Sequence, residues 1–327
     1  MHTFLSIAES GNSASEKTEK VSHAECKSGV PCMYQNEVDL RIIILTCNRA
    51  GALSKLLTSL LALRPLNDTF ALDIWIDVDK KNRVDEKTLQ VAQSFKWPFA
   101  VDVHVQQTHA GIYGQWIDTW RPRADSKELA LILEDDLIVS PFAWQWIKAA
   151  HAHYGTDDFN MGYTLQSEKR NNAINGKPIN VKGTVAFYYR VMGSWGFVPH
   201  PKWWRDFQDW YHEKSKDASF KPYVKGIIMT QWFKNFEKKN TADSMWTIWH
   251  IFFTDMHKLY AVYNNLNQLT GTDSHNLCVH RAEPGLHYKG KARQDVEKLL
   301  LDYWSSTFVD FPEKTPKLDY SGKPIAA

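Results

Sequence analysis

The most constraining feature of the sequence is an apolar run, Leu129–Val139, that is interrupted by three consecutive acids at Glu134–Asp136. Burying charge without a partner costs several kcal/mol, so acids inside a strand-like segment require a compensating interaction. The run is short and is followed by Ser140-Pro141, which predicts a buried strand that ends at the acids and turns into a helix.

Two explanations of these acids remain open from the residues alone. The carboxyl ends of parallel strands are where open α/β sheets bind ligands, and Mg²⁺ or Mn²⁺ is commonly shared between carboxylates and a diphosphate. Alternatively, the acids cap the following helix, whose N-terminus favours negative charge. Capping needs only one acid, so the sequence favours a divalent-metal site.

Strands and helices are expected to alternate through the first half of the chain, which predicts an α/β fold with a mostly parallel sheet and right-handed crossovers. The expected strands are 41–46, 72–76, 100–105 and 129–134. The expected helices are 53–61, 84–95, one through Trp116 and Trp120, and 142–153 after the acids.

Composition divides the chain into four predicted parts. Residues 1–37 are polar and aperiodic and are expected to be a flexible leader, followed by a nucleotide-binding α/β half at 38–140. Most aromatic residues lie in the less regular second half at 141–295, and 296–327 is expected to hold a C-terminal helix and tail.

Overall charge and hydropathy exclude several classes of function. With 39 basic against 37 acidic residues, the net charge is close to zero and does not indicate a nucleic-acid partner. No apolar stretch reaches the length of a membrane span, although peripheral contact through aromatic loops stays open. The four cysteines form no zinc or disulfide pattern. The expected location is the cytoplasm, or a lumen if an anchor or signal has been removed.

Candidate site residues also occur outside the acidic strand. Trp195 lies between two glycines, where it is either an exposed ligand-facing ring or a core residue beside a tight turn. Residues 241–249 are expected to start a helix with Asp243 near its first turn, where it is either the N-cap or a general base. The loop 283–291 contains His287, Lys289 and Lys291. Either His287 binds a metal and the two lysines bind a diphosphate, or the loop is a solvated charged segment. No glycine-rich dinucleotide or P-loop motif follows any expected strand.

The order of these motifs resembles that of nucleotide-sugar glycosyltransferases with the GT-A fold. It comprises Thr-Cys-Asn-Arg after the first strand, a second strand ending in acids, Leu-Glu-Asp-Asp, Gly-Ser-Trp-Gly, a helix-start Asp and a late Gly-Leu-His. The Glu-Asp-Asp triplet looks like the D-x-D motif of N-acetylglucosaminyltransferase I-like enzymes. The resemblance extends from about Leu40 to Lys291. It implies that 38–140 is a nucleotide-sugar-binding half and that 141–295 is the acceptor-side and catalytic half.

The resemblance implies a role for individual residues of the donor side. Asp136 would bind Mn²⁺ or Mg²⁺, while Glu134 and Asp135 would hold metal-bound water and the ribose. Thr46 and Arg49, after the first strand, would contact the nucleotide. Further residues implied to take part are Asp79 at the uracil, Trp195 at the donor sugar or the acceptor, His287 at the metal, and Lys289 and Lys291 at the diphosphate.

The resemblance also implies the reaction. A sugar would pass from a UDP-sugar to a hydroxyl of a glycan, glycolipid or glycoprotein acceptor, with inversion and with Asp243 as base. The usual motif at the base is Glu-Asp or Asp-Asp whereas this chain has Ala-Asp, so Asp206, Asp209 and Glu213 are competitors. The alternatives are a non-catalytic glycan- or nucleotide-sugar-binding module and a sugar nucleotidyltransferase.

Overall fold

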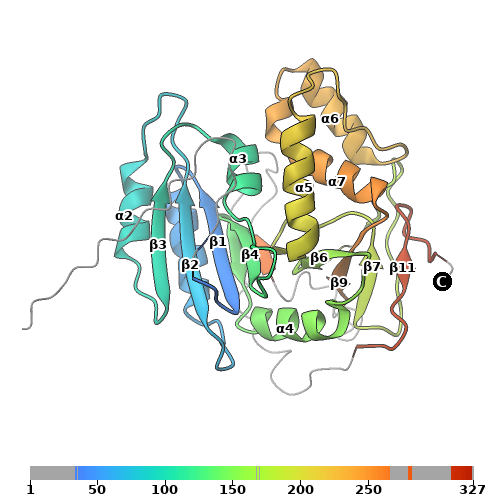
Figure 1. Cartoon of the computed structure of the whole chain (residues 1–327), viewed down its shortest axis with the longest axis horizontal. Coiled ribbons are helices and arrows are strands. Elements are labelled where there is room, and N and C mark those ends of the chain that lie inside the picture. The colour runs from blue at the N-terminus through green and yellow to red at the C-terminus, as the bar shows by residue number, and fades with distance from the viewer. Residues whose placement is uncertain are drawn as a thin grey trace, which may run out of the picture.

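Nine strands form one mixed, mostly parallel sheet in the order β11-β7-β9-β6-β8-β4-β1-β2-β3 (Figure 1). The computed structural model describes Tyr34, residues 36–166, Glu168, and residues 170–265, 279–281 and 311–325. The strands are β1 (Leu40–Thr46), β2 (Phe70–Ile76), β3 (Ala100–Val105), β4 (Leu129–Glu134), β5 (Leu137–Val139), β6 (Asn160–Thr164), β7 (Ala186–Tyr189), β8 (Phe197–Pro199), β9 (Tyr260–Asn264), β10 (Val279–Arg281) and β11 (Lys317–Leu318). β5 and β10 pair separately.

Helices cover both faces of this sheet. They are α1 (Ala50–Leu60), α2 (Glu86–Ser94), α3 (Gly111–Asp118), α4 (Ala143–Tyr154), α5 (Pro201–Lys214), α6 (Ile228–Lys238) and α7 (Thr247–Met256), with a 3-10 turn, η1 (Ala242–Ser244), before α7. None of the helices that the structure describes is long and apolar enough to span a bilayer.

The predicted α/β class is confirmed because the strands expected in the first half form and pair in parallel. β1 pairs with β2 on one side and β4 on the other, and β2 pairs with β3. The predicted helix start at Asp243 is wrong, because the chain makes a 3-10 turn there and α7 begins at Thr247. The helix through Trp116 ends at Asp118, before Trp120.

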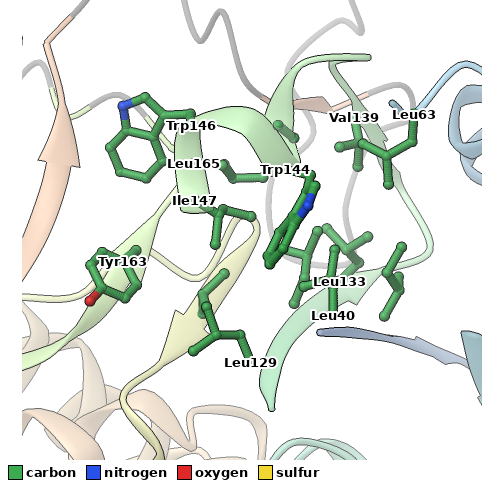
Figure 2. Packing of buried hydrophobic residues seen from close by; sticks show 14 of the residues in the cluster. Leu40, Leu63, Leu129, Leu133, Val139, Trp144, Trp146, Ile147, Tyr163 and Leu165 are labelled. Carbon is green, nitrogen blue, oxygen red and sulfur yellow. The ribbon is translucent and has the colours of Figure 1, made fainter. Parts of the chain in front are cut away.

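Two hydrophobic clusters lie on opposite faces of the sheet, because successive side chains of a strand point to opposite faces. Figure 2 shows Trp144 and Ile147 of α4 packed with Leu133 and Leu129 of β4 in the first cluster. The second cluster joins the other face of β4 to α3, α5, α6 and α7 through residues such as Ile132. β4 is therefore buried on both sides, and its acidic end is held rigidly.

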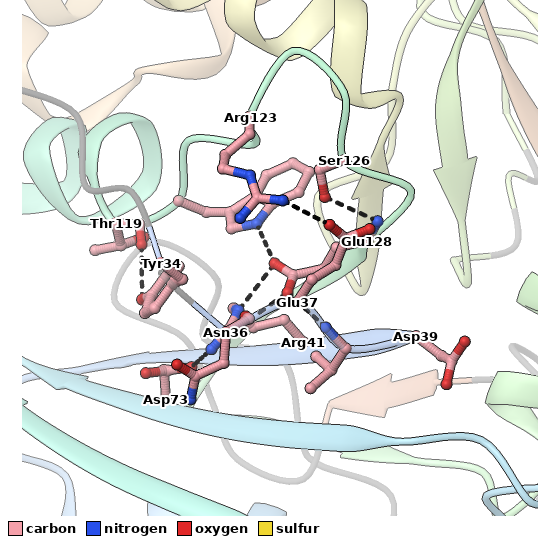
Figure 3. A network of polar contacts seen from close by, with 12 residues as sticks. Tyr34, Asn36, Glu37, Asp39, Arg41, Asp73, Thr119, Arg123, Ser126 and Glu128 are labelled. Atoms are coloured by element: carbon pink, nitrogen blue, oxygen red, sulfur yellow. Dashed lines mark hydrogen bonds and ion pairs between the residues drawn. The ribbon is translucent and has the colours of Figure 1, made fainter.

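A buried ionic network joins neighbouring strands on the second face of the sheet (Figure 3). Arg41 of β1 donates to Asp73 of β2 at 2.7 Å and to Glu128, just before β4, at 2.9 and 3.0 Å. The Asp73 carboxylate also contacts Nε2 of His104 on β3 at 2.7 Å. Trp120 donates its indole N–H to Glu128 at 3.0 Å. The Arg41 guanidinium thus links β1 to β2 and to the residue that precedes β4.

Replacing Arg41 should destabilise the fold strongly. In Arg41→Met, the carboxylates of Asp73 and Glu128 would stay buried without their cation, and we expect the free energy of unfolding to fall by about 3–5 kcal/mol. Urea denaturation measures this. The control is Arg123→Met, which breaks an exposed pair with Glu37 and should cost less than about 1 kcal/mol. Equal losses in both variants would contradict the assigned role of the network.

Candidate active site

The acidic triplet lies where β4 ends, beside the end of β1. Glu134 is the last residue of β4, and Asp135 and Asp136 form the turn before β5. The carboxylate of Asp135 accepts a hydrogen bond from Thr46 Oγ1 at 2.7 Å, and its backbone N–H donates to Leu45 O at 3.2 Å. The two aspartate side chains are 5–6% exposed, so their charges need local compensation.

Arg49 supplies a positive charge between the two aspartates. Its Nη1 lies 3.0 Å from Asp135 Oδ1 and 3.2 Å from Asp136 Oδ2. Arg49 immediately precedes α1, in the loop after β1, and its side chain is 25% exposed. The loop that carries the motif Thr-Cys-Asn-Arg therefore contacts the acids. One partly exposed guanidinium faces two nearly buried carboxylates.

Glu134 has a different environment. Its carboxylate accepts a hydrogen bond from the indole N–H of Trp116 at 3.0 Å. Burial, together with the negative charges of Asp136 and Asp135, raises the pKa of Glu134 to about 7. Burial is the largest of these causes, while the hydrogen bond from Trp116 and the charge of Arg49 act in the opposite direction.

Asp77, after β2, is a further acid at this edge whose role the sequence analysis missed. Its carboxylate accepts hydrogen bonds from the backbone N–H groups of Ala110 at 2.8 Å and Gly111 at 2.9 Å, at the start of α3. His109 Nδ1 lies 3.1 Å away. Negative charge is favourable at a helix N-terminus, so Asp77 positions α3. Its place directly after a buried strand was the only sequence signal.

Helix α3 connects this edge to the region of Asp243. Tyr113 donates its hydroxyl to the carbonyls of Ala242 and Met245, both at 3.0 Å. The ring of Trp116, which also holds Glu134, stacks on Trp246 with 4.5 Å between centroids. η1 and the start of α7 are thus fixed relative to the end of β4.

Asp243 itself lies in η1 and is exposed. After burial and the neighbouring Tyr211, its negative charge contributes to raising the pKa of Tyr113. The competitors on α5 are engaged in surface ion pairs: Asp206 with Lys202 at 3.0 Å, Asp209 with Arg121 at 2.9 Å and Glu213 with Lys216 at 3.2 Å.

Strand pairing places the Gly-Ser-Trp-Gly segment at the same edge. β8 runs antiparallel to β4 with Phe197 opposite Ile132, so the turn that precedes β8 and contains Trp195 lies toward the Glu134 end of β4. Gly196 has φ +67°, a conformation that favours glycine. The Trp195 ring is half-buried and packs against the first hydrophobic cluster, and its backbone N–H donates to Gln166 Oε1 at 3.3 Å.

No described contact joins the remaining predicted residues to the acidic triplet. Asp79 lies in the loop after β2, where its carboxylate binds Arg83 at 2.7 Å and accepts the backbone N–H of Lys81 at 2.7 Å. Its pairing with uracil stays a prediction. His287, Lys289 and Lys291 lie outside the described residues.

Comparisons with known proteins give only a distant structural likeness. Searches for a matching sequence family and for a related curated protein find no match. Among solved structures, S. aureus TarS 1-349 is 16% identical with a TM-score of 0.38, covering 51% of this chain and 48% of that one.

Two further TarS structures have similar scores. S. aureus TarS is 13% identical with a TM-score of 0.37, over 71% of this chain and 38% of that one. TarS 1-349 in complex with UDP is 12% identical with a TM-score of 0.36, over 71% and 62%. The chain thus covers less than two thirds of the length of each of these TarS chains.

The raised pKa of Glu134 predicts a pH dependence of stability in metal-free protein. Folding raises this pKa from 4.5 to about 7, so between these values the native state binds more protons than the unfolded chain. The free energy of unfolding should therefore fall as the pH rises through this window. Glu134→Gln should lack this contribution. Urea denaturation in EDTA across the window measures it, and parallel wild-type and variant curves would contradict it.

Proposed function

We propose that this protein is a GT-A-type glycosyltransferase that moves a sugar from a UDP-sugar to a hydroxyl of a glycan or glycoconjugate acceptor. One observation carries the proposal: α3 fixes the buried acid cluster at the end of β4 and the exposed Asp243 to one another. Trp116 contacts both Glu134 and Trp246, and Tyr113 holds η1. A buried charged site beside a solvent-accessible carboxylate suits a polar donor next to an acceptor.

The donor would lie across the carboxyl ends of β1 and β4. Ligands of open α/β sheets bind at this edge, where Thr46, Arg49 and the acids of β4 meet. Arg49 is already partly exposed, so its guanidinium can contact a diphosphate while remaining near the aspartates. Trp195 would border the sugar, because the register of β8 brings it to this end of β4.

The acid cluster fits a divalent cation in charge and in chemistry. Asp135 and Asp136 both contact the Arg49 guanidinium, and Glu134 directly precedes them, so acidic groups outnumber that cation at this edge. Among the described residues, no three His, Cys, Asp or Glu side chains could hold a metal ion by themselves. Mg²⁺ and Mn²⁺ are often bound by one or two carboxylates together with substrate phosphates, which suits this edge.

In the proposed reaction, Asp243 removes the proton of the acceptor hydroxyl while that oxygen attacks the anomeric carbon. A bound cation would neutralise charge that develops on the departing diphosphate. Arg49 would act in the same direction from the protein side, and its charge is most useful in the transition state. A single base opposite the leaving group gives inversion at the anomeric carbon. The lysines Lys289 and Lys291 and the ligand His287 remain proposed parts of this donor site.

The direct test is a screen of nucleotide sugars for slow hydrolysis with Mn²⁺ or Mg²⁺, which needs no acceptor. It should be accompanied by calorimetry of UDP with and without Mn²⁺. Metal-dependent UDP binding with donor hydrolysis supports the transferase. UDP binding without hydrolysis of any donor favours the binding module, and pyrophosphate formation from a sugar phosphate and UTP favours the nucleotidyltransferase.

Replacing Asp136 should abolish metal-dependent binding of UDP. In Asp136→Asn, the proposed metal ligand is lost, and turnover should fall about a thousandfold or more, because a bound cation contributes several kcal/mol of charge stabilisation. Calorimetry and donor hydrolysis measure the two effects. Asp125→Asn, at a side chain that is 82% exposed, is the matched control and should behave as wild type. Unchanged Mn²⁺ dependence in Asp136→Asn would remove Asp136 from the metal site.

Replacing Asp243 should affect turnover and spare donor binding. General-base catalysis contributes about 10²–10⁴-fold, so kcat of Asp243→Asn should drop within that range while UDP affinity is unchanged. Asp206→Asn and Asp209→Asn are matched controls, since each removes a surface carboxylate of α5. If one of these controls loses turnover and Asp243→Asn does not, the base is on α5.

A further inference from the structure

An exposed apolar face lies on α6, away from the acidic edge. Trp232 of α6 is 49% exposed and Ile174, in the loop before β7, is 46% exposed. Ile228 lies one helical turn before Trp232 and is half-buried. Figure 1 shows α6 at the rim of the second half of the molecule, on the far side of α5 from β1–β3. We name Ile174, Ile228 and Trp232 the α6 face.

Backbone contacts bring these residues together from distant parts of the sequence. Ala173 and Ile227 form an isolated antiparallel bridge, and the backbone N–H of Ile174 donates to Gly226 O at 3.3 Å. The loop at Ile174 is therefore fixed against the N-terminus of α6. The buried side of the helix, with Met229 and Phe233, packs into the second hydrophobic cluster, so the outward position of Trp232 follows from helix geometry.

The segment around this face is basic. Residues 213–239 contain seven lysines against Glu213, Asp217 and Glu237, a net charge of 7 − 3 = +4 in a chain whose total is +2. Lys225 precedes α6 and Lys239 follows it, and both are exposed. In a helix, Lys239 falls on the same side as Trp232, seven residues earlier. Cations therefore border the exposed apolar side chains at both ends of the helix.

We propose that the α6 face docks on an anionic lipid bilayer. An exposed Trp with apolar neighbours and flanking lysines is the composition of an interfacial helix, whose ring enters the headgroup region while the ammonium groups meet lipid phosphates. An anionic polysaccharide would be bound by lysines and could stack on Trp232, but it would leave the exposed aliphatic chain of Ile174 without a partner. The proposal does not depend on the proposed transferase activity.

Docking would also orient the candidate active site. The backbone N–H of Thr241 donates to Phe236 O at 2.9 Å, which joins the end of α6 directly to η1 and Asp243. A bilayer against α6 would therefore keep η1 at a fixed position relative to the membrane surface. The carboxylate of Asp243 would then meet acceptors presented from that surface.

The test is co-sedimentation of the full chain with vesicles of equal parts phosphatidylglycerol and phosphatidylcholine, and with phosphatidylcholine vesicles alone. We expect binding to the anionic vesicles only, weakened by salt. Trp232→Ser should reduce partitioning at least tenfold, and Lys225→Gln and Lys239→Gln, which each remove one positive charge, about fivefold each. The controls are Leu61→Ser and Met256→Ser, which remove other exposed apolar side chains and should bind as wild type.

Three outcomes would overturn the proposal: no binding to anionic vesicles, equal binding by Trp232→Ser with its fold verified by circular dichroism, or equal loss in the two controls. Sedimentation velocity distinguishes a second copy as the occupant. A dimer that Trp232→Ser dissociates, without vesicle binding, would assign the face to self-association. Retention by an anionic polysaccharide column without vesicle binding would likewise refute the lipid assignment.

Discussion

The concentration of negative charge at one edge of the sheet is the constraint on which the rest of the structure depends. Four acids lie at the ends of β2 and β4, and they are stabilised in three ways. Asp77 accepts backbone N–H groups at the start of α3, Asp135 and Asp136 share Arg49, and Glu134 accepts the indole N–H of Trp116. Burial, with the negative charges of Asp136 and Asp135, raises the pKa of Glu134 to about 7, although the hydrogen bond from Trp116 and the charge of Arg49 lower it.

Helix α3 stabilises the acids of this edge and also holds η1 near them. Its N-terminal N–H groups hold Asp77, while its side chains reach Glu134 and η1. Gln115 of the same helix donates to the carbonyls of Thr46 and Trp75, at the ends of β1 and β2. A single short helix therefore sets the distance between the acids and the proposed base. The acids need rigidity and burial, whereas the base must be reached by an acceptor, and the arrangement meets both requirements.

The parts of the fold that depend on local pattern could be predicted from the sequence. A buried parallel strand is a continuous apolar run, so β1 and β4 could be predicted, and with them the position of Arg49 and the acids at the carboxyl ends of neighbouring strands. Long-range contacts could not be predicted. The single charge on Arg41 gave no sign of its carboxylate partners on β2 and before β4, because ion-pair partners far apart in sequence carry no periodic signal. Asp243 was placed at a helix start because its flanking residues are helix-like, yet Tyr113 binds the turn and holds it as η1.

Arg49 compensates the charge of the buried acid pair. Two aspartates that are 5–6% exposed would repel each other strongly if neither had a partner, and a guanidinium at 3.0 and 3.2 Å offsets part of that repulsion. The guanidinium is itself 25% exposed, so it can contact a ligand while it remains near the aspartates. In the proposed donor site, Asp136 would hold a divalent cation that supplies further positive charge, and Arg49 would contact the diphosphate. The same guanidinium would therefore stabilise the acids in the free protein and the diphosphate in the complex.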